Sequence, residues 1–554
     1  MYPESMQESI RKVEASRARR IELALSGKPV VEPMSAEQRQ DVLDRFHPDY
    51  QDDARREVRW GPNAGQRLTT EVADLLETYA RVDPSDYDLL EPDFDTDVLV
   101  IGAGSAGFCA ALLAQEHGAR VTLATKLRLG DANSMMAQGG IQAAVRDDDS
   151  PVHHYLDVVG GGHFDNRPEL ARALVSEAPD AIAWLRRKGV MFDQEDDGSL
   201  KAKPGGGTCR PRMLSARDYT GAAICRTLRD EIQNRPEIRV LEHSSAIELI
   251  KDARGRVAGA VLYHLLTREH FTIRARATVM ATGGFGRLHV KGFETTNHYG
   301  ATADGLVMAY RAGARLLYMD SVQYHPTGAV FPPQILGFLC TEKLRGMGGQ
   351  PVNADGELFV YPLEPRDVEA ASFIREATEL GHGVSTPSGH VGIWLDTPVI
   401  EKLNGAGAIE KNLPAMLRQF QRFGVDIRSE PILVYPTLHY QNGGIEIDVE
   451  CRSTVEGLYA AGEVAGGIHG RNRLMGNSQL DLIVFGRRAG RYAAAFAGTA
   501  EPAELSLGHV LEANRRVGEL GVDRDRISPL VLPDYVPERV KRRQHDTRYR
   551  GTLI

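Results

Sequence analysis

The sequence contains few cysteines, and they lie far apart. Only five occur in 554 residues, and no two of them have the spacing C-x-x-C. Structural zinc sites and iron–sulfur clusters are held by closely spaced thiolates. We therefore expect no metal site on this chain, and the low cysteine content favours a reducing compartment.

A long apolar run and an excess of basic charge are also absent. No stretch approaches the roughly 18 apolar residues that a membrane-spanning helix needs, and residues 1–25 lack the apolar core of a signal peptide. The 66 Lys and Arg against 75 Asp and Glu give a net charge of −9, which offers no electrostatic attraction to nucleic acid. We expect a cytoplasmic protein without a membrane span or a nucleic-acid partner, so any membrane association would come through partner subunits.

Residues 1–95 differ in composition from the rest of the chain. They are rich in Arg, Glu, Asp and Gln, with helices predicted around 5–26 and 68–81 between irregular segments. Composition favours a solvated charged extension, because few apolar residues are present to bury. The length of the segment supports an alternative, in which it docks a partner protein.

The first clear local motif begins at residue 95. It reads DTDVLVIGAGSAGFCAALLAQEHGARVTLAT, in which two apolar runs flank a glycine-rich turn and an alanine-rich helical stretch. Gly102, Gly104 and Gly107 form G-x-G-x-x-G. In this motif the first glycine permits the turn, the second lets the backbone reach a pyrophosphate, and the third lets helix pack on strand. The segment therefore predicts a β-turn-α-β unit with a dinucleotide at the helix N-terminus.

Other segments indicate which dinucleotide binds. Thr125 and Lys126 stand where an NAD site would carry a carboxylate for the ribose, which argues against NAD. Residues 277–286 and 455–467 are two more strands that run into glycine turns, and Glu463 in the second could accept ribose hydroxyls. Three such turns suggest one extended ligand across the ends of a sheet, and FAD fits this better than a mononucleotide.

Together these segments resemble the succinate dehydrogenase/fumarate reductase flavoprotein family, which also contains L-aspartate oxidase. The resemblance runs from about Asp95 to about Arg491 and includes MAQGGIQAA, SARDYTG, MATGGFGR, VQYHPTG, CTEKLRGMGG, LEPRD, PTLHYQNGGI and HGRNRLMGNS. It implies an α/β fold, with a Rossmann-like FAD-binding domain and an inserted α+β capping domain. The implied organisation is an N-terminal extension (1–95), the FAD-binding domain (96–320 and 440–495), the capping domain (321–439) and a short C-terminal tail (496–554).

By this resemblance the glycine-rich stretch 127–144 wraps the flavin. Asn133 stands where respiratory members carry a histidine that bonds covalently to the flavin, so we expect FAD to be held non-covalently. Non-covalent binding favours fumarate reduction, or oxidation of a more easily oxidised substrate, over efficient succinate oxidation. From its residue type alone, Asn133 is equally well a turn residue. The cofactor-binding residues that the resemblance implies are Gly102, Gly104, Ser105, Ala106, Gly107, Thr125, Lys126, Asn133, Ser134, Gln138, Gly139, Gly140, Thr282, Gly283, Asp304, Glu463, Asn477, Ser478 and Gln479.

The resemblance also implies a dicarboxylate substrate that is gripped at both ends. His325 and Thr341 match the residues that bind one carboxylate, and His439 and Arg473 match those that bind the other. A guanidinium can hold a carboxylate through two parallel hydrogen bonds. Taken singly, a histidine beside a proline is usually structural, but four matches in four distant segments favour the substrate site.

The catalytic residues are implied in the same way. Arg366 matches the group that exchanges a proton with the substrate carbon, while flavin N5 exchanges the hydride. Glu342 and Arg345 match the other members of a proton relay. The spacing of this pair alone is equally typical of a surface salt bridge on one helical turn, so the relay comes from the resemblance.

Three functions remain open from the sequence. In the first, favoured by VQYHPTG and NRLMGNS, the chain is the flavoprotein subunit of a fumarate reductase or succinate dehydrogenase-like complex and receives electrons from an iron–sulfur subunit. In the second, favoured by NSMMAQGGI and the longer spacing from His325 to Thr341, it is L-aspartate oxidase. In the third it is a redox-complex subunit with vestigial turnover, and the presence of every catalytic match argues against this.

Overall fold

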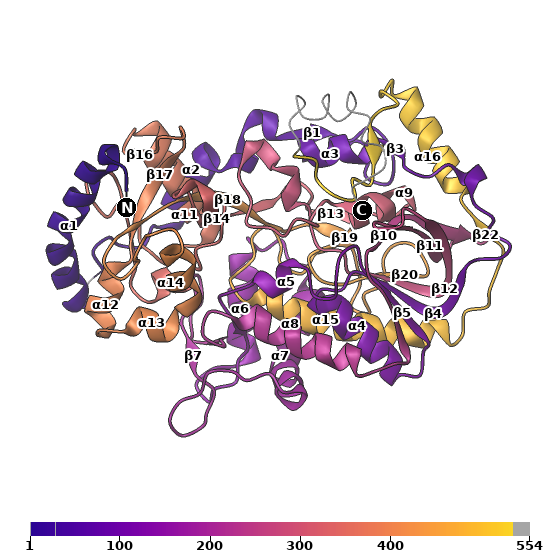
Figure 1. Ribbon diagram of the computed structural model, residues 1–554, viewed down its shortest axis with the longest axis horizontal. Coiled ribbons are helices and arrows are strands. Elements are labelled where there is room, and N and C mark those ends of the chain that lie inside the picture. The colour runs from indigo at the N-terminus through magenta and orange to yellow at the C-terminus, as the bar shows by residue number, and fades with distance from the viewer. Residues whose placement is uncertain (1, 28, 536–554) are drawn as a thin grey trace.

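The computed structural model describes residues 2–27 and 29–535, which fold around two sheets (Figure 1). One sheet has eight strands and the other five, and each sheet has its own hydrophobic core. We call them the larger and the smaller unit. The protein has a mixed α/β fold, as predicted. Residues 536–554, the last part of the predicted tail, lie outside the described residues.

The sheet of the larger unit contains the predicted β-turn-α-β unit. Strand β4 (Phe94–Ile101) leads into α4 (Ser105–Glu116), and β5 (Val121–Ala124) pairs with β4 in parallel. The strand order is β22-β10-β11-β12-β4-β5-β9, with β20 on β12. The bounds of the other strands are β9 (Ile238–Leu241), β10 (Ser244–Asp252), β11 (Val257–His264), β12 (His270–Met280), β20 (Leu458–Ala460) and β22 (Leu505–Ser506).

Helices cover this sheet on both sides. In Figure 1, α4, α7 (Pro168–Lys188), α8 (Thr220–Gln233) and α15 (Asn477–Ala497) lie below the sheet, and α9 (Asp304–Arg311) lies above it. Strand β4 buries every residue from Val98 to Ile101, as expected for a parallel strand covered on both faces. The carboxyl ends of β4, β5 and β12 are therefore left facing a gap between the helix layers, where ligands bind in folds of this kind.

The smaller unit is built on antiparallel strands. Strand β14 (Val322–Ala329) pairs with β18 (Ile432–Gln441), which pairs with β17 (Val391–Asp396), and β15 (Gln350–Val352) completes the row. Helices α11 (Arg366–Ile374), α12 (Pro398–Asn404), α13 (Ala408–Asn412) and α14 (Pro414–Gln421) pack around them. The limits predicted for the capping domain are residues 321 and 439. Strand β14 begins at Val322 and strand β18 ends at Gln441, each within two residues of one limit.

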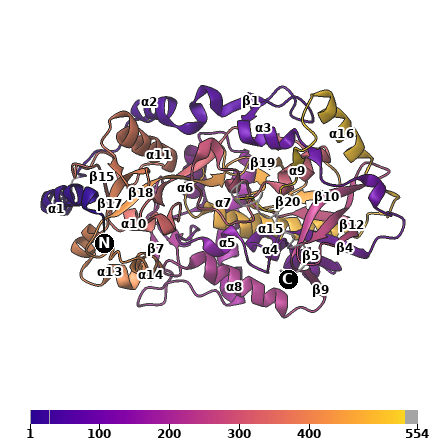
Figure 2. The ribbon, with the colours of Figure 1, turned by 45° about the horizontal axis from the view of Figure 1, so that its top comes forward.

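The described part of the N-terminal segment, residues 2–27 and 29–95, lies along the outside of both units (Figure 2). Helix α1 (Glu4–Leu25) inserts Met6, Ile10 and Val13 into the core of the smaller unit. Helix α2 (Ala36–Phe46) packs on α11, and α3 (Thr70–Leu76) inserts Val72 into the core of the larger unit. The interpretation as a solvated extension is wrong, because its few apolar residues are concentrated on the faces that pack against the chain.

Candidate active site

A cavity of about 550 Å³ opens at the carboxyl ends of β4, β5 and β12 and extends to the smaller unit. The N-terminus of α4 faces it through Gly104 and Ala106. A helix N-terminus presents free N–H groups to an anion, so this end fits a pyrophosphate. The predicted cofactor residues that line the cavity are Gly102, Gly104, Ala106, Thr125, Lys126, Asn133, Ser134, Gln138, Thr282, Gly283, Asp304, Glu463, Ser478 and Gln479.

Two glycines of the motif shape this end of the cavity. Gly102 has a φ of +111°, and a Cβ there would lie 2.2 Å from the carbonyl oxygen of Ala281. A Cβ at Gly107 would lie 1.8 Å from the carbonyl oxygen of Gly102. Gly107 therefore does not line the cavity but lets α4 pack against the turn, and the neighbouring Ser105 is buried in the same place. The turn needs glycine at both positions.

Three further predicted cofactor residues lie outside the cavity lining. A Cβ at Gly140 would lie 2.6 Å from the carbonyl oxygen of Leu214, and a Cβ at Gly139 would lie 3.0 Å from Sδ of Met475. Both glycines thus serve close packing. The side chain of Asn477 contacts Nε2 of His154 at 2.9 Å.

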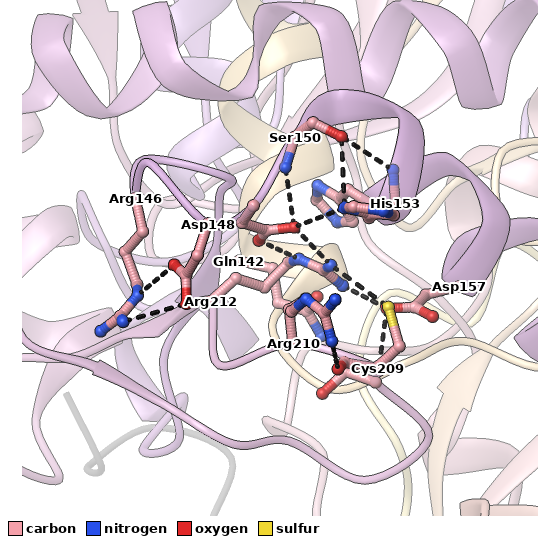
Figure 3. Close-up of polar contacts among 12 residues, drawn as sticks. Gln142, Arg146, Asp148, Ser150, His153, Asp157, Cys209, Arg210 and Arg212 are labelled. Atoms are coloured by element: carbon pink, nitrogen blue, oxygen red, sulfur yellow. Dashed lines mark hydrogen bonds and ion pairs between the residues drawn. The ribbon is translucent and has the colours of Figure 1, made fainter.

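Arg212 anchors the segment that follows these glycines (Figure 3). Its guanidinium, which is only 1% exposed, donates from Nε to Asp149 at 2.8 Å and also pairs with Asp157 on α6 (Pro151–Gly161). The carbonyl oxygen of Arg212 accepts from the backbone N–H of Ala143. The charge pairs of Arg212 with Asp149 and Asp157 therefore hold the segment at Ala143 in place.

Asn133 lies at the start of α5 (Asn133–Met136) and joins three segments. Its amide nitrogen donates to Oδ1 of Asn297 at 2.8 Å and to Glu463 at 3.3 Å, and its amide oxygen accepts from the backbone of His298 at 2.5 Å. Burial raises the pKa of Glu463 to about 7. Lys126 pairs with Asp304 at 2.6 Å, so the charge of this lysine is already balanced.

Three of the four predicted substrate residues, His325, His439 and Arg473, lie close together where the two units meet. His325 on β14 and His439 on β18 have ring centroids 4.9 Å apart, since the two strands are paired. Arg473 and His439 line the cavity, and the Arg473 guanidinium lies 4.4 Å from the centroid of the Tyr440 ring. His325 and Thr341 are buried.

Buried guanidiniums act on both histidines of this group. Burial lowers the pKa of His325 well below its usual value, and Arg366, His439, Arg345 and Arg473 lower it further. Burial and Arg366 lower the pKa of Arg473 to about 9, and its Nε has no hydrogen-bond partner among the described residues. Buried cations without partners are costly, so the site fits an anion with several acceptor oxygens.

The three predicted relay residues are in contact. Nε of Arg366 donates to Glu342 at 2.8 Å, and Arg345 lies 3.7 Å from the same oxygen. The other oxygen of Glu342 accepts from the backbone N–H of Gly206 at 2.9 Å. Although burial raises the pKa of Glu342, the two guanidiniums outweigh it and hold the pKa at about 2. This is a buried cluster at α10 (Lys343–Gly346) and α11, so the interpretation of the Glu342–Arg345 pair as a surface salt bridge is wrong.

Two residues of the site were not predicted from the sequence. Gln323 accepts from Nη1 of Arg366 at 3.0 Å, and Glu369 pairs with Arg345. Gln323 is two residues before His325 on a strand, and Glu369 is three residues after Arg366 on a helix, so both share a face with a predicted residue. The spacing of two on a strand could have identified Gln323 from the sequence, and the spacing of three on a helix could have identified Glu369.

No group of three or more His, Cys, Asp and Glu residues close enough to hold a metal ion occurs in 2–27 and 29–535. Over the same ranges, no helix has the length and apolar character needed to cross a membrane.

Comparisons with known proteins show the family to which the chain belongs. The model of the FAD binding domain family matches residues 97–479. One subunit of the fumarate reductase (CoM/CoB) of Methanothermobacter marburgensis is 39% identical over 72% of this chain and 73% of its own length. The L-aspartate oxidase of Streptomyces coelicolor is 37% identical, and the match covers 71% of this chain and 67% of its own length.

Among solved structures, the FrdA chain of Escherichia coli quinol fumarate reductase superposes with a TM-score of 0.70. It is 32% identical, and the match covers 77% of this chain and 74% of FrdA. The protein is therefore an FAD-binding oxidoreductase. It belongs to the family formed by the flavoprotein subunits of fumarate reductase and succinate dehydrogenase together with L-aspartate oxidase.

Proposed function

We propose that the protein is the flavoprotein subunit of a fumarate reductase or succinate dehydrogenase-like complex and interconverts fumarate and succinate. One observation carries the choice of substrate. The buried guanidiniums of Arg473 and Arg366 lie beside His325, Arg473 lines the cavity, and Nε of Arg473 has no hydrogen-bond partner among the described residues. A dicarboxylate would neutralise this cluster.

L-Aspartate would fit the cluster less well, because it adds an ammonium group. The carboxylate that contacts Arg366 is Glu342, and it is already engaged by Arg366, Arg345 and the backbone of Gly206. An ammonium there would lack a free anionic partner and would face buried guanidiniums. The charge balance thus favours a substrate with two carboxylates and no amine.

FAD would lie in the 550 Å³ cavity, with its pyrophosphate at the N-terminus of α4. When bound, it supplies hydride transfer at N5 of its ring. Asn133 would contact the flavin without a covalent bond, because a carboxamide offers no nucleophilic ring nitrogen of the kind found in histidine. Non-covalent binding is therefore part of the proposal.

His325 and Thr341 would hold one carboxylate of the substrate, and His439 and Arg473 the other. Because both ends of the substrate would be anchored, its central carbons would be held in a fixed orientation against the flavin. The smaller unit would act as the capping domain, since β14, β18, α10 and α11 place its buried side chains over this position. Excluding water strengthens every charge interaction in the site.

Arg366 would give a proton to the substrate carbon during reduction and take it back during oxidation. Burial lowers the pKa of Arg366 below its usual value, which makes the proton easier to release. Glu342 remains ionised beside it, so it can orient the guanidinium and return a proton from Arg345. Gln323 fixes the other side of the guanidinium.

An iron–sulfur protein would supply the electrons for reduction. Several relatives bear the name flavoprotein subunit, including the fumarate reductase flavoprotein subunit of a Serratia strain at 34% identity. The chain itself has no C-x-x-C pair. The partner would have to approach the flavin from outside the cavity.

Two assays test the proposal. Under anaerobic conditions, purified protein should oxidise reduced viologen when fumarate is added. In air-saturated buffer, it should not consume oxygen when L-aspartate is added. The opposite pattern would replace the proposal with the oxidase, and inactivity in both assays would favour the vestigial redox-complex member.

A further inference from the structure

A second cavity, of about 540 Å³, lies between the two units and reaches Glu342. Its walls come from β7 (Ala202–Lys203) and β8 (Met213–Leu214) in the larger unit and from α10 and α13 in the smaller unit. Strand β7 lies beside α13 and α14 in both ribbon views (Figures 1 and 2). We call it the lysine cavity, because Lys201, Lys203, Lys343 and Lys411 line it.

Two of these lysines are withdrawn from solvent without a full set of partners. Lys343 is 6% exposed, and its Nζ donates to the backbone carbonyls of Arg217 at 2.8 Å and Asn412 at 2.9 Å. Nζ of Lys203 has no hydrogen-bond partner in the described part of the chain, and its ion pair with Asp193 is loose, at 3.8 Å. A shielded ammonium without such partners costs free energy.

The surrounding charges do not balance the two lysines. Burial and Lys203 lower the pKa of Lys343 to about 7, while Asp193 and Asp218 act in the opposite direction. These carboxylates already accept backbone N–H groups, Asp218 from two residues of α14 and Asp193 from Arg217. Glu342, the carboxylate in the cavity wall, is held by Arg366. The ammonium of Lys203 is therefore left with one loose ion pair and no hydrogen bond among the described residues, and a bound anion would supply acceptors to it and favour the charged form of Lys343.

We propose that the lysine cavity binds a small dianion between Lys203 and Lys343, and that this dianion is the dicarboxylate on its way to or from the active site. The volume of about 540 Å³ is within the range of small-molecule sites. Carboxylate oxygens would give Lys203 the acceptors it lacks. Lys411 is exposed and would attract an anion from solvent, whereas Lys201 already pairs with Glu195 at 3.2 Å. The identity of the dianion rests on the proposed function.

Binding can be counted without turnover. Malonate, a dicarboxylate that cannot be reduced, is titrated into FAD-loaded protein by calorimetry, with inorganic phosphate as a separate probe. We expect two malonate sites in the wild type and one in Lys203→Gln. Lys203→Arg should keep two sites, because it keeps the charge, and this separates loss of the site from a folding defect.

In steady-state kinetics, we expect loss of the Lys203 charge to raise KM and to leave kcat nearly unchanged. Lys203→Gln should raise KM for fumarate about fivefold and leave kcat within about twofold, since local substrate concentration falls while the reacting groups stay in place. Lys402→Gln is the matched control, because Lys402 is exposed on α12 and does not line the cavity. It should change neither constant.

In the titration, the proposal is overturned by one malonate site in the wild type, by two malonate sites in Lys203→Gln, or by a cavity site that binds phosphate and not malonate. In the kinetic assay, it is overturned if Lys203→Gln lowers kcat and leaves KM unchanged. Failure of the proposed function would give a different result. In that case Arg473→Ala would leave malonate binding unchanged, and this outcome does not depend on the behaviour of Lys203→Gln.

Discussion

The two ends of the active-site cavity are built from different parts of the chain. At the cofactor end, Gly102, Gly104, Thr282 and Gly283 expose backbone groups at the ends of strands. At the substrate end, several segments present the buried side chains of His325, Arg366 and Arg473 and the half-buried side chain of His439. We call the two sets the cofactor end and the substrate end.

The difference shows how each end would recognise its ligand. Backbone N–H groups at a helix N-terminus are fixed by the fold, so the cofactor end needs no net charge of its own. The substrate end has unbalanced positive charge, and its pKa values are shifted by burial and by neighbouring cations. A substitution at one end should therefore leave ligand binding at the other end intact.

The largest effect is expected at the substrate end, from Arg366→Lys. Turnover should fall at least about 100-fold, because an ammonium cannot replace the guanidinium that contacts both Glu342 and Gln323. FAD content and malonate affinity should stay near wild type, as measured by absorbance and calorimetry. Near-normal turnover would remove Arg366 from its proposed role.

Arg473→Ala should weaken dicarboxylate binding without loss of FAD. A charge-assisted hydrogen bond contributes about 1.5–3 kcal/mol, so the malonate dissociation constant of the active site should rise about 10- to 100-fold. Tyr440, whose ring lies against the guanidinium, offers a control. Tyr440→Phe keeps the ring and should change the constant only slightly.

The fold and the cofactor end were largely predictable because they depend on local sequence. The β-turn-α-β unit was predicted from an apolar run, three glycines and an alanine-rich stretch, and the structure contains it. The packing of residues 1–95 was not predictable. Met6, Ile10 and Val13 contact a core whose other buried residues, apart from Tyr2, lie more than 300 positions away, and no local pattern records such contacts.

The substrate end was predicted only through the family resemblance. Nothing near Glu342 in the sequence shows that Arg366 and Gly206 will surround it. Glu369 was missed for the same reason, since its partner Arg345 lies 24 residues earlier. Burial of paired charges is a tertiary property, and it is also what shifts their pKa values.

At the cofactor end, Gly102→Ala should weaken FAD binding about tenfold. The added Cβ would meet the carbonyl oxygen of Ala281 in a backbone conformation with φ of +111°, so the turn must shift. FAD release measured by fluorescence checks this. Gly118→Ala is the control, because its φ is also positive but nothing lies within 4 Å of a Cβ there. If both variants hold FAD equally, the turn geometry is not what binds the cofactor.

The smallest effect is expected from Glu369→Gln, which tests the charge balance of the substrate end. Burial, Glu342 and Glu364 raise the pKa of Glu369 to about 8, against the pull of Arg345. The carboxyl group therefore binds its proton more tightly in the folded state than in the unfolded state. Stability from this group is complete below its unfolded pKa, near 4.5, and is lost as the pH rises toward 8.

Glutamine keeps the hydrogen-bonding shape and cannot ionise, so the variant should lose part of this pH dependence. Between pH 5 and 8 the wild-type Tm should fall more than the Tm of Glu369→Gln, by about 1–3 °C for a chain of this size. Glu379→Gln, at an exposed position that follows α11, should match the wild type. Parallel Tm profiles for Glu369→Gln and the wild type would mean that Glu369 is ionised in the folded protein. The negative charge on Glu369 would then balance Arg345, and the contrast in charge between the substrate end and the cofactor end would be smaller.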